Sequence, residues 1–209
     1  MPKTGLMHSV TLQGIALFLA VATPIAQGDS CAVKGENFLL DPSFTERDDH
    51  GRLAHWRSLQ HAGESSFEVT IENGELTIAK TGTQPWFMFR QSIKTEQLAG
   101  KKLAFDAELK FDLQPPAVAS MFTLGGGLQL AAKPASSGRP LLRSSLNHEP
   151  RLGKVDWHAV QVVVQLPRRT GLIELGFAHQ ADGVLQIRQP TFRLVDESEQ
   201  PCEITPLQF

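Results

Sequence analysis

The strongest constraint on the fold is the alternation of side chains over residues 103–113. Every odd position in this segment is apolar, and the even positions from Asp106 to Asp112 are charged. Side chains of a β-strand point alternately to the two faces of a sheet, so this pattern buries one face and exposes the other. A helix would scatter the same apolar residues around its axis. The segment therefore predicts a strand of an antiparallel sheet, with Leu109 in the core and Glu108 in water.

A β-hairpin is predicted over residues 67–80. Asn73 and Gly74 stand between two alternating segments, and both tolerate the positive φ angles of a type I′ turn. Pairing across this turn places apolar residues together on one face and two carboxylates on the other: Ile71 with Leu76, Val69 with Ile78, and Glu72 with Glu75. The like charges of the last pair are a mild cost in an otherwise favourable hairpin.

Further strands are predicted at 86–93, 121–130, 157–166, 172–178 and 184–195, separated by loops with turn-forming residues. Pro190 cannot donate to a β-ladder, so the last strand should contain a bulge or switch sheets there. The glycines at 125–127 predict a bulge or a tight bend. After residue 28, no segment of ten or more residues has a convincing helical period. The chain therefore predicts an all-β sandwich or barrel, and the thirteen prolines favour the sandwich.

Residues 1–28 are typical of a secretory signal peptide. Lys3 provides a positive start, an apolar run covers residues 15–22, and no acidic residue precedes Asp29. The run is too short to span a bilayer as a helix, and no later stretch is apolar enough to do so. We therefore expect an exported protein, periplasmic or extracellular, with one domain at residues 29–209. N-terminal sequencing of the mature protein tests this expectation.

Cys31 and Cys202 are the only cysteines, and they stand near opposite ends of the predicted domain. In an oxidising compartment such a pair most simply forms a disulfide, which mass spectrometry of the unreduced protein would detect. The full chain has 20 basic and 22 acidic side chains, and loss of residues 1–28 removes Lys3 alone, which leaves a net charge of −3. This small and mixed charge argues against nucleic acid or an anionic membrane as the partner.

Four short motifs follow one another in a recognisable order. They are Asn37-Phe38-Leu39-Leu40-Asp41-Pro42-Ser43-Phe44 before Trp56, Gln91-Ser92-Ile93 before Leu98-Ala99-Gly100-Lys101, Trp157 before the strand at 160–167, and 184–187 before 192–194. This order resembles the galactose-binding-type jelly roll of the carbohydrate-binding modules in families four, nine and twenty-two, over about residues 37–195. The resemblance implies an antiparallel jelly-roll β-sandwich and a carbohydrate partner.

The resemblance is incomplete at positions that these modules use near a structural calcium ion. They often have Glu after the opening Phe and Asp in the last strand, where this sequence has Thr45, followed by Glu46, and Gln189-Pro190. Calcium prefers charged oxygen ligands, and no histidines here have the spacing of a metal motif. We therefore predict neither a metal ion nor a cofactor.

The candidate ligand-binding residues start from Trp86. With Phe87 and Phe89 in the core, alternation sends Trp86 and Arg90 to an outer face, where an indole can stack on a sugar ring and a guanidinium can bond its hydroxyls. A Trp86 covered by a loop is equally consistent with the sequence. Carboxylates and an amide on other strands complete the candidate site, which comprises Trp86, Arg90, Asp106, Glu108 and Gln129.

The other two tryptophans, Trp56 and Trp157, are predicted to pack in the core, because large aromatic side chains dominate sandwich cores. Three functions remain open. A non-catalytic carbohydrate-binding protein is favoured by the resemblance, and an exposed Trp86 with polar neighbours would support it. A flat apolar patch would favour a structural or protein-interaction sandwich of the cell envelope. Two carboxylates facing each other across a cleft would favour a sugar-active enzyme on the same scaffold.

Overall fold

The computed structural model describes residues 35–94, 97–116, 125–136, 139–144 and 151–195. The predicted signal peptide and both cysteines of the predicted disulfide, Cys31 and Cys202, lie outside these residues, so export and the disulfide stay predictions. A search of the described residues finds no helix with the length and apolar character needed to cross a lipid bilayer.

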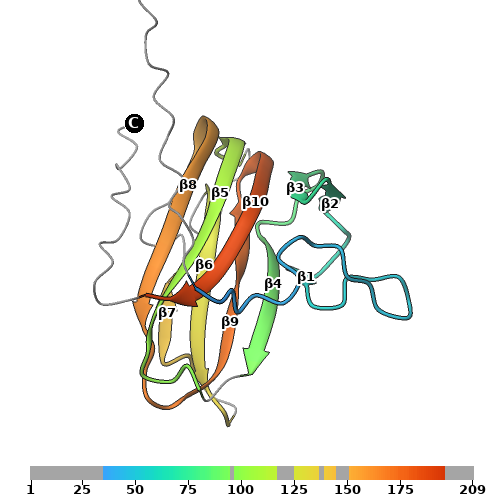
Figure 1. The fold of residues 1–209 in the computed structure, drawn as a ribbon. Helices are drawn as coiled ribbons and strands as arrows, with labels where there is room; N and C mark the ends of the chain where they lie inside the picture. Colours follow the sequence, from blue (N-terminus) through green and yellow to red (C-terminus); the bar gives the residue numbers. More distant parts are fainter. Residues whose placement is uncertain (1–34, 95–96, 117–124, 137–138, 145–150, 196–209) are drawn as a thin grey trace, which may run out of the picture.

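Two antiparallel five-stranded sheets pack against each other (Figure 1). The first sheet has the strand order β1-β4-β9-β6-β7, and the second has the order β2-β3-β10-β5-β8. The strands are β1 Arg57–Gln60, β2 Phe67–Glu72, β3 Glu75–Lys80, β4 Phe87–Lys94, β5 Lys102–Gln114, β6 Gly125–Pro134, β7 Leu142–Ser144, β8 Gly153–Gln165, β9 Thr170–Gln180 and β10 Asp182–Leu194. The predicted all-β antiparallel sandwich is confirmed.

Strand β5 and the β2–β3 hairpin have the predicted side-chain facing. Leu109 of β5 is fully buried in the core, and Asp112 is exposed on the other face. In the hairpin, Ile71 pairs with Leu76, and Glu72 lies opposite Glu75. The turn residues Asn73 and Gly74 have φ angles of 52° and 79°, as a type I′ turn requires. Local sequence patterns therefore determine both elements.

The two predicted irregularities have different outcomes. The register of β10 on β5 shifts between Arg188 and Thr191, and Gln189 has a φ of 51°, so the bulge at Pro190 is confirmed. The bulge predicted at 125–127 is wrong, because these glycines pair with β9 in regular register. A Cβ atom at Gly126 would lie 2.7 Å from Cδ1 of Leu113, so a close approach between the two sheets is what requires glycine there.

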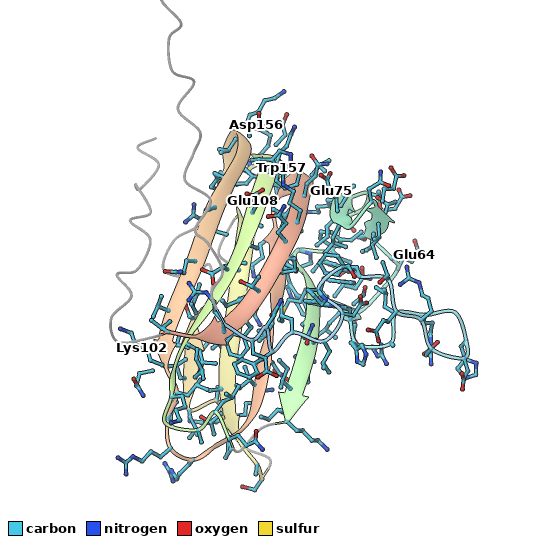
Figure 2. All side chains as sticks on the ribbon, in the orientation of Figure 1. Glu64, Glu75, Lys102, Glu108, Asp156 and Trp157 are labelled. Carbon is cyan, nitrogen blue, oxygen red and sulfur yellow. The ribbon has the colours of Figure 1, made fainter. Side chains whose placement is uncertain are left out.

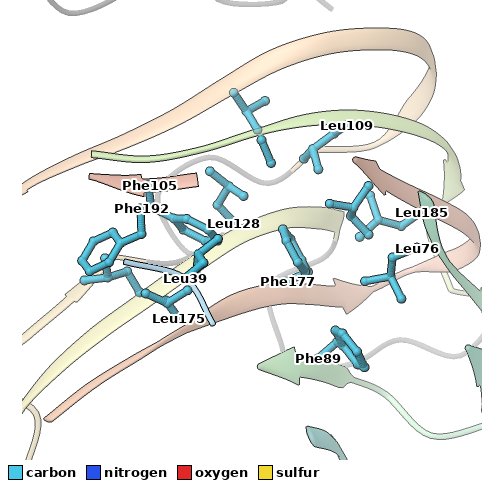
Figure 3. Close-up of a cluster of buried hydrophobic side chains, with 14 of the residues drawn as sticks. Leu39, Leu76, Phe89, Phe105, Leu109, Leu128, Leu175, Phe177, Leu185 and Phe192 are labelled. Atoms are coloured by element: carbon cyan, nitrogen blue, oxygen red, sulfur yellow. The ribbon is translucent and has the colours of Figure 1, made fainter. Parts of the chain in front are cut away.

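The core between the sheets is built around aromatic rings (Figure 3). Trp56 is buried, and its ring stacks on those of Phe89 and Phe177, with centroids 5.2 and 5.8 Å apart. The indole Nε1 donates a hydrogen bond of 2.9 Å to the carbonyl oxygen of Asp41. The predicted packing role of Trp56 is therefore confirmed, and its polar atom is satisfied inside the core.

Residues of the first sequence motifs attach the segment before β1 to both sheets. The Asn37 Oδ1 atom accepts a hydrogen bond of 2.9 Å from the backbone N–H of Phe192 in β10. The side-chain amide of Gln91 in β4 pairs with both the N–H and the carbonyl of Leu40, each at 3.0 Å. These motif residues are buried or half-buried structural links, and their polar groups are already used by the backbone.

His179 of β9 is a buried titratable residue whose pKa is strongly shifted by its surroundings. It is fully inaccessible and packs edge-on against Phe67, with ring centroids 5.3 Å apart. Burial and, to a smaller extent, the charge of nearby Lys80 lower the pKa of His179, whereas the hydrogen bond to the Gly183 carbonyl and the charge of Asp182 oppose the shift; together they set the pKa at about 4. The folded protein therefore favours the neutral ring.

Acidification should therefore destabilise the protein between pH 6.5 and about 4. The unfolded chain protonates this histidine near its ordinary value, so stability is full above that value and decreases as the pH falls toward the folded value. The loss through His179 approaches about 3 kcal/mol. Denaturant titrations at several pH values measure it. His179→Gln keeps a donor for the Gly183 carbonyl and should remove most of this dependence; an unchanged pH dependence in that variant would contradict the assignment.

Candidate functional site

The five predicted ligand-binding residues lie on two surfaces. Arg90 of β4 and Gln129 of β6 both pair with Gly176 of β9, so these two side chains lie in one row of the first sheet. Asp106 and Glu108 lie on β5, in the second sheet. The prediction of one binding surface that contains all five residues is therefore wrong. Alternation separates buried from outward side chains, but it does not say which of the two sheets a strand joins.

Most of the charged side chains on the outer surface of the first sheet are cations. Phe87, Phe89 and Phe177 are buried in the core, so the residues that alternate with them on β4 and β9 point outward. The pairing of β1, β4, β9, β6 and β7 brings one carboxylate and five basic side chains to this outer surface: Glu174, Arg57, Arg90, Lys94, Lys133 and Arg143. We call this surface the cationic face.

Two cations share one carboxylate at the centre of the cationic face. An Oε2 atom of Glu174 lies 3.0 Å from Nη1 of Arg90 and 2.6 Å from Nζ of Lys133. The Glu174 side chain is 12% exposed, whereas those of Arg90 and Lys133 are 29% and 27% exposed. The carboxylate neutralises one of the two positive charges, and both cations keep contact with solvent. The cluster is therefore a half-buried site with one excess positive charge.

Trp86 lies at the end of this surface, directly before β4. Its side chain is half-buried, and the ring of His61 meets it edge-on at a centroid distance of 6.5 Å. His61 is held in turn by Gln84, with 3.1 Å between Nδ1 and Oε1. Phe87 and Phe89 are buried as predicted, so the outward direction predicted for Arg90 of β4 is confirmed. Trp86 lies outside the strand, so its outward direction stays a prediction. Trp86 is thus partly covered and partly accessible.

Trp157 lies on the outer side of the second sheet, so its predicted place in the core is wrong (Figure 2). The register of β8 on β5 shifts between the partners of Leu109 and Phe111, which places two residues between the inward-facing Val155 and His158. The shift turns His158 toward Phe111 and Trp157 outward, where the Cζ atom of Arg188 lies 4.2 Å from its ring centroid. Val160 and Val164 are buried and have the opposite parity to Trp157, so the alternation of this part of β8 already directs Trp157 outward; the prediction of core packing overlooked it.

The carboxylates of the second sheet are already paired. Glu108 lies 2.5 Å from Nε of Arg188. Asp106 accepts a hydrogen bond of 2.5 Å from Gln161 Nε2 and lies 3.5 Å from Arg193 Nε. Burial raises the pKa of Asp106, and the Gln161 hydrogen bond and the Arg193 charge oppose that rise. These contacts link neighbouring strands, which favours a structural role for both carboxylates.

Sequence reasoning missed the centre of the cationic face. Glu174 belongs to a segment that reads as an ordinary strand, Lys133 lies beyond the strand predicted at 121–130, and nothing local connects either residue with Arg90. The described residues contain no group of three histidine, cysteine, aspartate or glutamate side chains that could hold a metal ion. The arrangement offers donors, acceptors and excess positive charge, a set of groups suited to polar recognition.

Comparison with known proteins identifies the fold. No protein-family model and no curated protein matches the sequence. A solved CBM4 module is similar in structure, with a TM-score of 0.50 and 15% identity over 75% of this chain and 99% of that one. The CBM22-1 xylan-binding domain of Paenibacillus barcinonensis Xyn10C has a TM-score of 0.46 and 14% identity, covering 75% of this chain and 93% of that one. The chain has the jelly-roll fold of carbohydrate-binding modules.

A catalytic protein also occurs among the similar structures. The enzymatically active domain of bacteriophage CBA120 tailspike protein 4 has a TM-score of 0.49 and 13% identity over 68% of this chain. This chain spans only 20% of the length of that tailspike chain. The predicted resemblance to carbohydrate-binding modules is confirmed at the level of fold, which by itself does not determine function.

Proposed function

We propose that this protein is a non-catalytic carbohydrate-binding protein that holds an oligosaccharide or polysaccharide on the cationic face. The observation that carries the proposal is the cluster of Arg90, Glu174 and Lys133 at the centre of an outer sheet surface. Arginine and lysine donate to sugar oxygens, Glu174 and Gln129 accept from hydroxyls, and the Trp86 indole offers an apolar ring for stacking. The jelly-roll fold supports this proposal because it is the fold of the similar CBM4 module.

The same geometry favours binding over hydrolysis. Most glycoside hydrolases use two carboxylates that flank the scissile bond. Glu174 is the carboxylate that the described residues place on the cationic face, and it is held by two cations. Asp106 and Glu108, the carboxylates predicted earlier, lie on the other sheet. Non-catalytic recognition therefore explains this surface without requiring a second carboxylate.

Two tryptophan variants test the placement of the ligand. Calorimetry against plant, bacterial and algal polysaccharides should detect binding, and Trp86→Ala should weaken it by about fivefold, since stacking on an indole contributes about 1 kcal/mol. Trp157→Ala is the matched control, because Trp157 is half-buried on the opposite sheet. Circular dichroism confirms that both variants remain folded.

If Trp86→Ala left binding unaffected and Trp157→Ala abolished it, the ligand would bind to the second sheet instead. An absence of heat with every polysaccharide would overturn the proposal and favour a structural role in the cell envelope.

A further inference from the structure

The two outer surfaces of the sandwich differ in how far their cations are paired with carboxylates. On the second sheet, four cations have carboxylate partners: Arg188 with Glu108 and Glu75, Arg193 with Asp106, Lys110 with Asp156, and Lys154 with Asp112. The cationic face carries five basic side chains against Glu174, a net charge of +4, although the whole chain has a net charge of −2. Positive charge is therefore concentrated on one side of the molecule.

Three cations of this face, Arg57, Lys94 and Arg143, are exposed and form no ion pair with any residue that the structure describes. Arg57 lies directly opposite Arg90 on the neighbouring strand, a like-charge pair that destabilises a sheet. The Arg57 guanidinium donates to the carbonyls of Leu53 and Trp56, which uses its N–H groups without neutralising its charge. An anionic ligand would relieve this repulsion.

The cations are spread along the sheet and are not gathered at one point. Arg90 and Lys94 are four residues apart on β4, about 13 Å at the rise of a β-strand. Lys94 and Lys133 both pair with Leu172 from opposite sides, so they are two strand spacings apart, about 10 Å. These are distances between backbone positions, and long side chains shorten some of them, as Arg90 and Lys133 do where both reach Glu174. A single small anion would still contact only part of this set, whereas an extended chain with repeated negative groups can contact all of it.

We propose that the ligand of the cationic face is an acidic polysaccharide whose sugar units carry carboxylates. This inference rests on the proposed function and specifies its ligand class. Arginine and lysine bind carboxylates through charge-assisted hydrogen bonds, which are about twice as strong as neutral ones. Trp86, directly before β4, is the one aromatic side chain that the proposed site uses, against five cations, so charge outweighs ring stacking in the recognition.

Polygalacturonate and its fully methyl-esterified form provide the direct test, because esterification removes the charge and keeps the sugar backbone. In affinity electrophoresis or calorimetry, the full protein should bind the acidic polymer at least about tenfold more tightly than the ester. Raising NaCl from about 0.05 M to about 0.5 M should weaken this binding by about tenfold, because salt screens exposed charges.

Charge variants on the two sheets locate the binding surface. Lys94→Gln and Arg143→Gln should each weaken polygalacturonate binding by about twofold to fivefold, and the double variant by about tenfold. Lys102→Gln is the matched control, because Lys102 is equally exposed but lies on β5 of the second sheet. It should leave the affinity unchanged.

Three results would overturn the inference. Equal affinity for the acidic and esterified polymers would reject the acidic ligand and leave the proposed function intact. Failure to bind any polysaccharide, acidic or neutral, would reject both. Equal affinity for duplex DNA or phosphatidylglycerol vesicles would show that the surface recognises charge without recognising sugar, which would also overturn the proposal.

Discussion

Leu109→Asp should abolish the cooperative unfolding transition of this protein. Leu109 is fully buried in the middle of β5, between Ile187 of β10 and His158 of β8, and burial lowers the pKa of His158, so this ring favours its neutral form. An aspartate there would place an unpaired charge in a medium that cannot solvate it, at a cost of more than about 4 kcal/mol. That is a large fraction of the 5 to 15 kcal/mol that typically stabilises a domain. Circular dichroism and thermal denaturation measure the loss of fold.

Asp112→Asn is the matched control for this experiment. Asp112 belongs to the same strand and points outward, with 53% of its side chain exposed beside Lys154. Its replacement should change the free energy of unfolding by less than about 0.5 kcal/mol. Glu108 would be a poor control because it pairs with Arg188. If Leu109→Asp and Asp112→Asn had similar effects, the facing of β5 would be wrong.

Gly176→Ala should destabilise the protein by about 4 kcal/mol and also weaken carbohydrate binding. A Cβ atom at this position would lie 2.0 Å from the carbonyl oxygen of Phe89 and 2.7 Å from Cα of Arg90. These are backbone atoms of β4, so β9 would have to move away from β4 to accept even one methyl group. Denaturant unfolding measures the first effect, and calorimetry at a temperature where the variant is folded measures the second.

Gly51→Ala separates this steric effect from the general cost of replacing glycine. Gly51 has a φ of 73°, but nothing lies within 4 Å of the position that its Cβ would occupy. Its replacement should cost about 1 kcal/mol, the strain of a left-handed conformation alone. A Gly176→Ala variant that lost no more stability than Gly51→Ala would show that β9 is not held as closely to β4 as the structure indicates.

The sequence predicts the parts of this fold that depend on neighbours along the chain. Alternation identifies the buried face of β5, and Asn73-Gly74 determines the register of its hairpin. Pro190 marks the bulge in β10 because its missing N–H has a purely local consequence. The short edge strands β1 and β7, of four and three residues, escaped detection because so few residues cannot establish a period.

The candidate site was only partly predictable, because it depends on which strands become neighbours. Arg90 and Gln129 share the first sheet and Trp86 directly precedes it, but Asp106 and Glu108 belong to the second. Glu174 joins Arg90 to Lys133 only because β9 lies between β4 and β6. No local pattern encodes that arrangement. The outward facing of Trp157, by contrast, was readable from the sequence, because Val160 and Val164 of the same strand have the opposite parity and are buried.

The strand order also has a consequence for how the chain folds. β9 and β10 are the last two strands that the structure describes, and each is the central strand of its sheet. β9 lies between β4 and β6, and β10 lies between β3 and β5. Until residues 170–194 have been synthesised, neither pair of strands can be joined into a sheet. Their open edges and apolar faces stay exposed in the nascent chain, which makes folding slow and late. Such a delay would leave the polypeptide unfolded for longer after translation, which is what the predicted export of this chain requires.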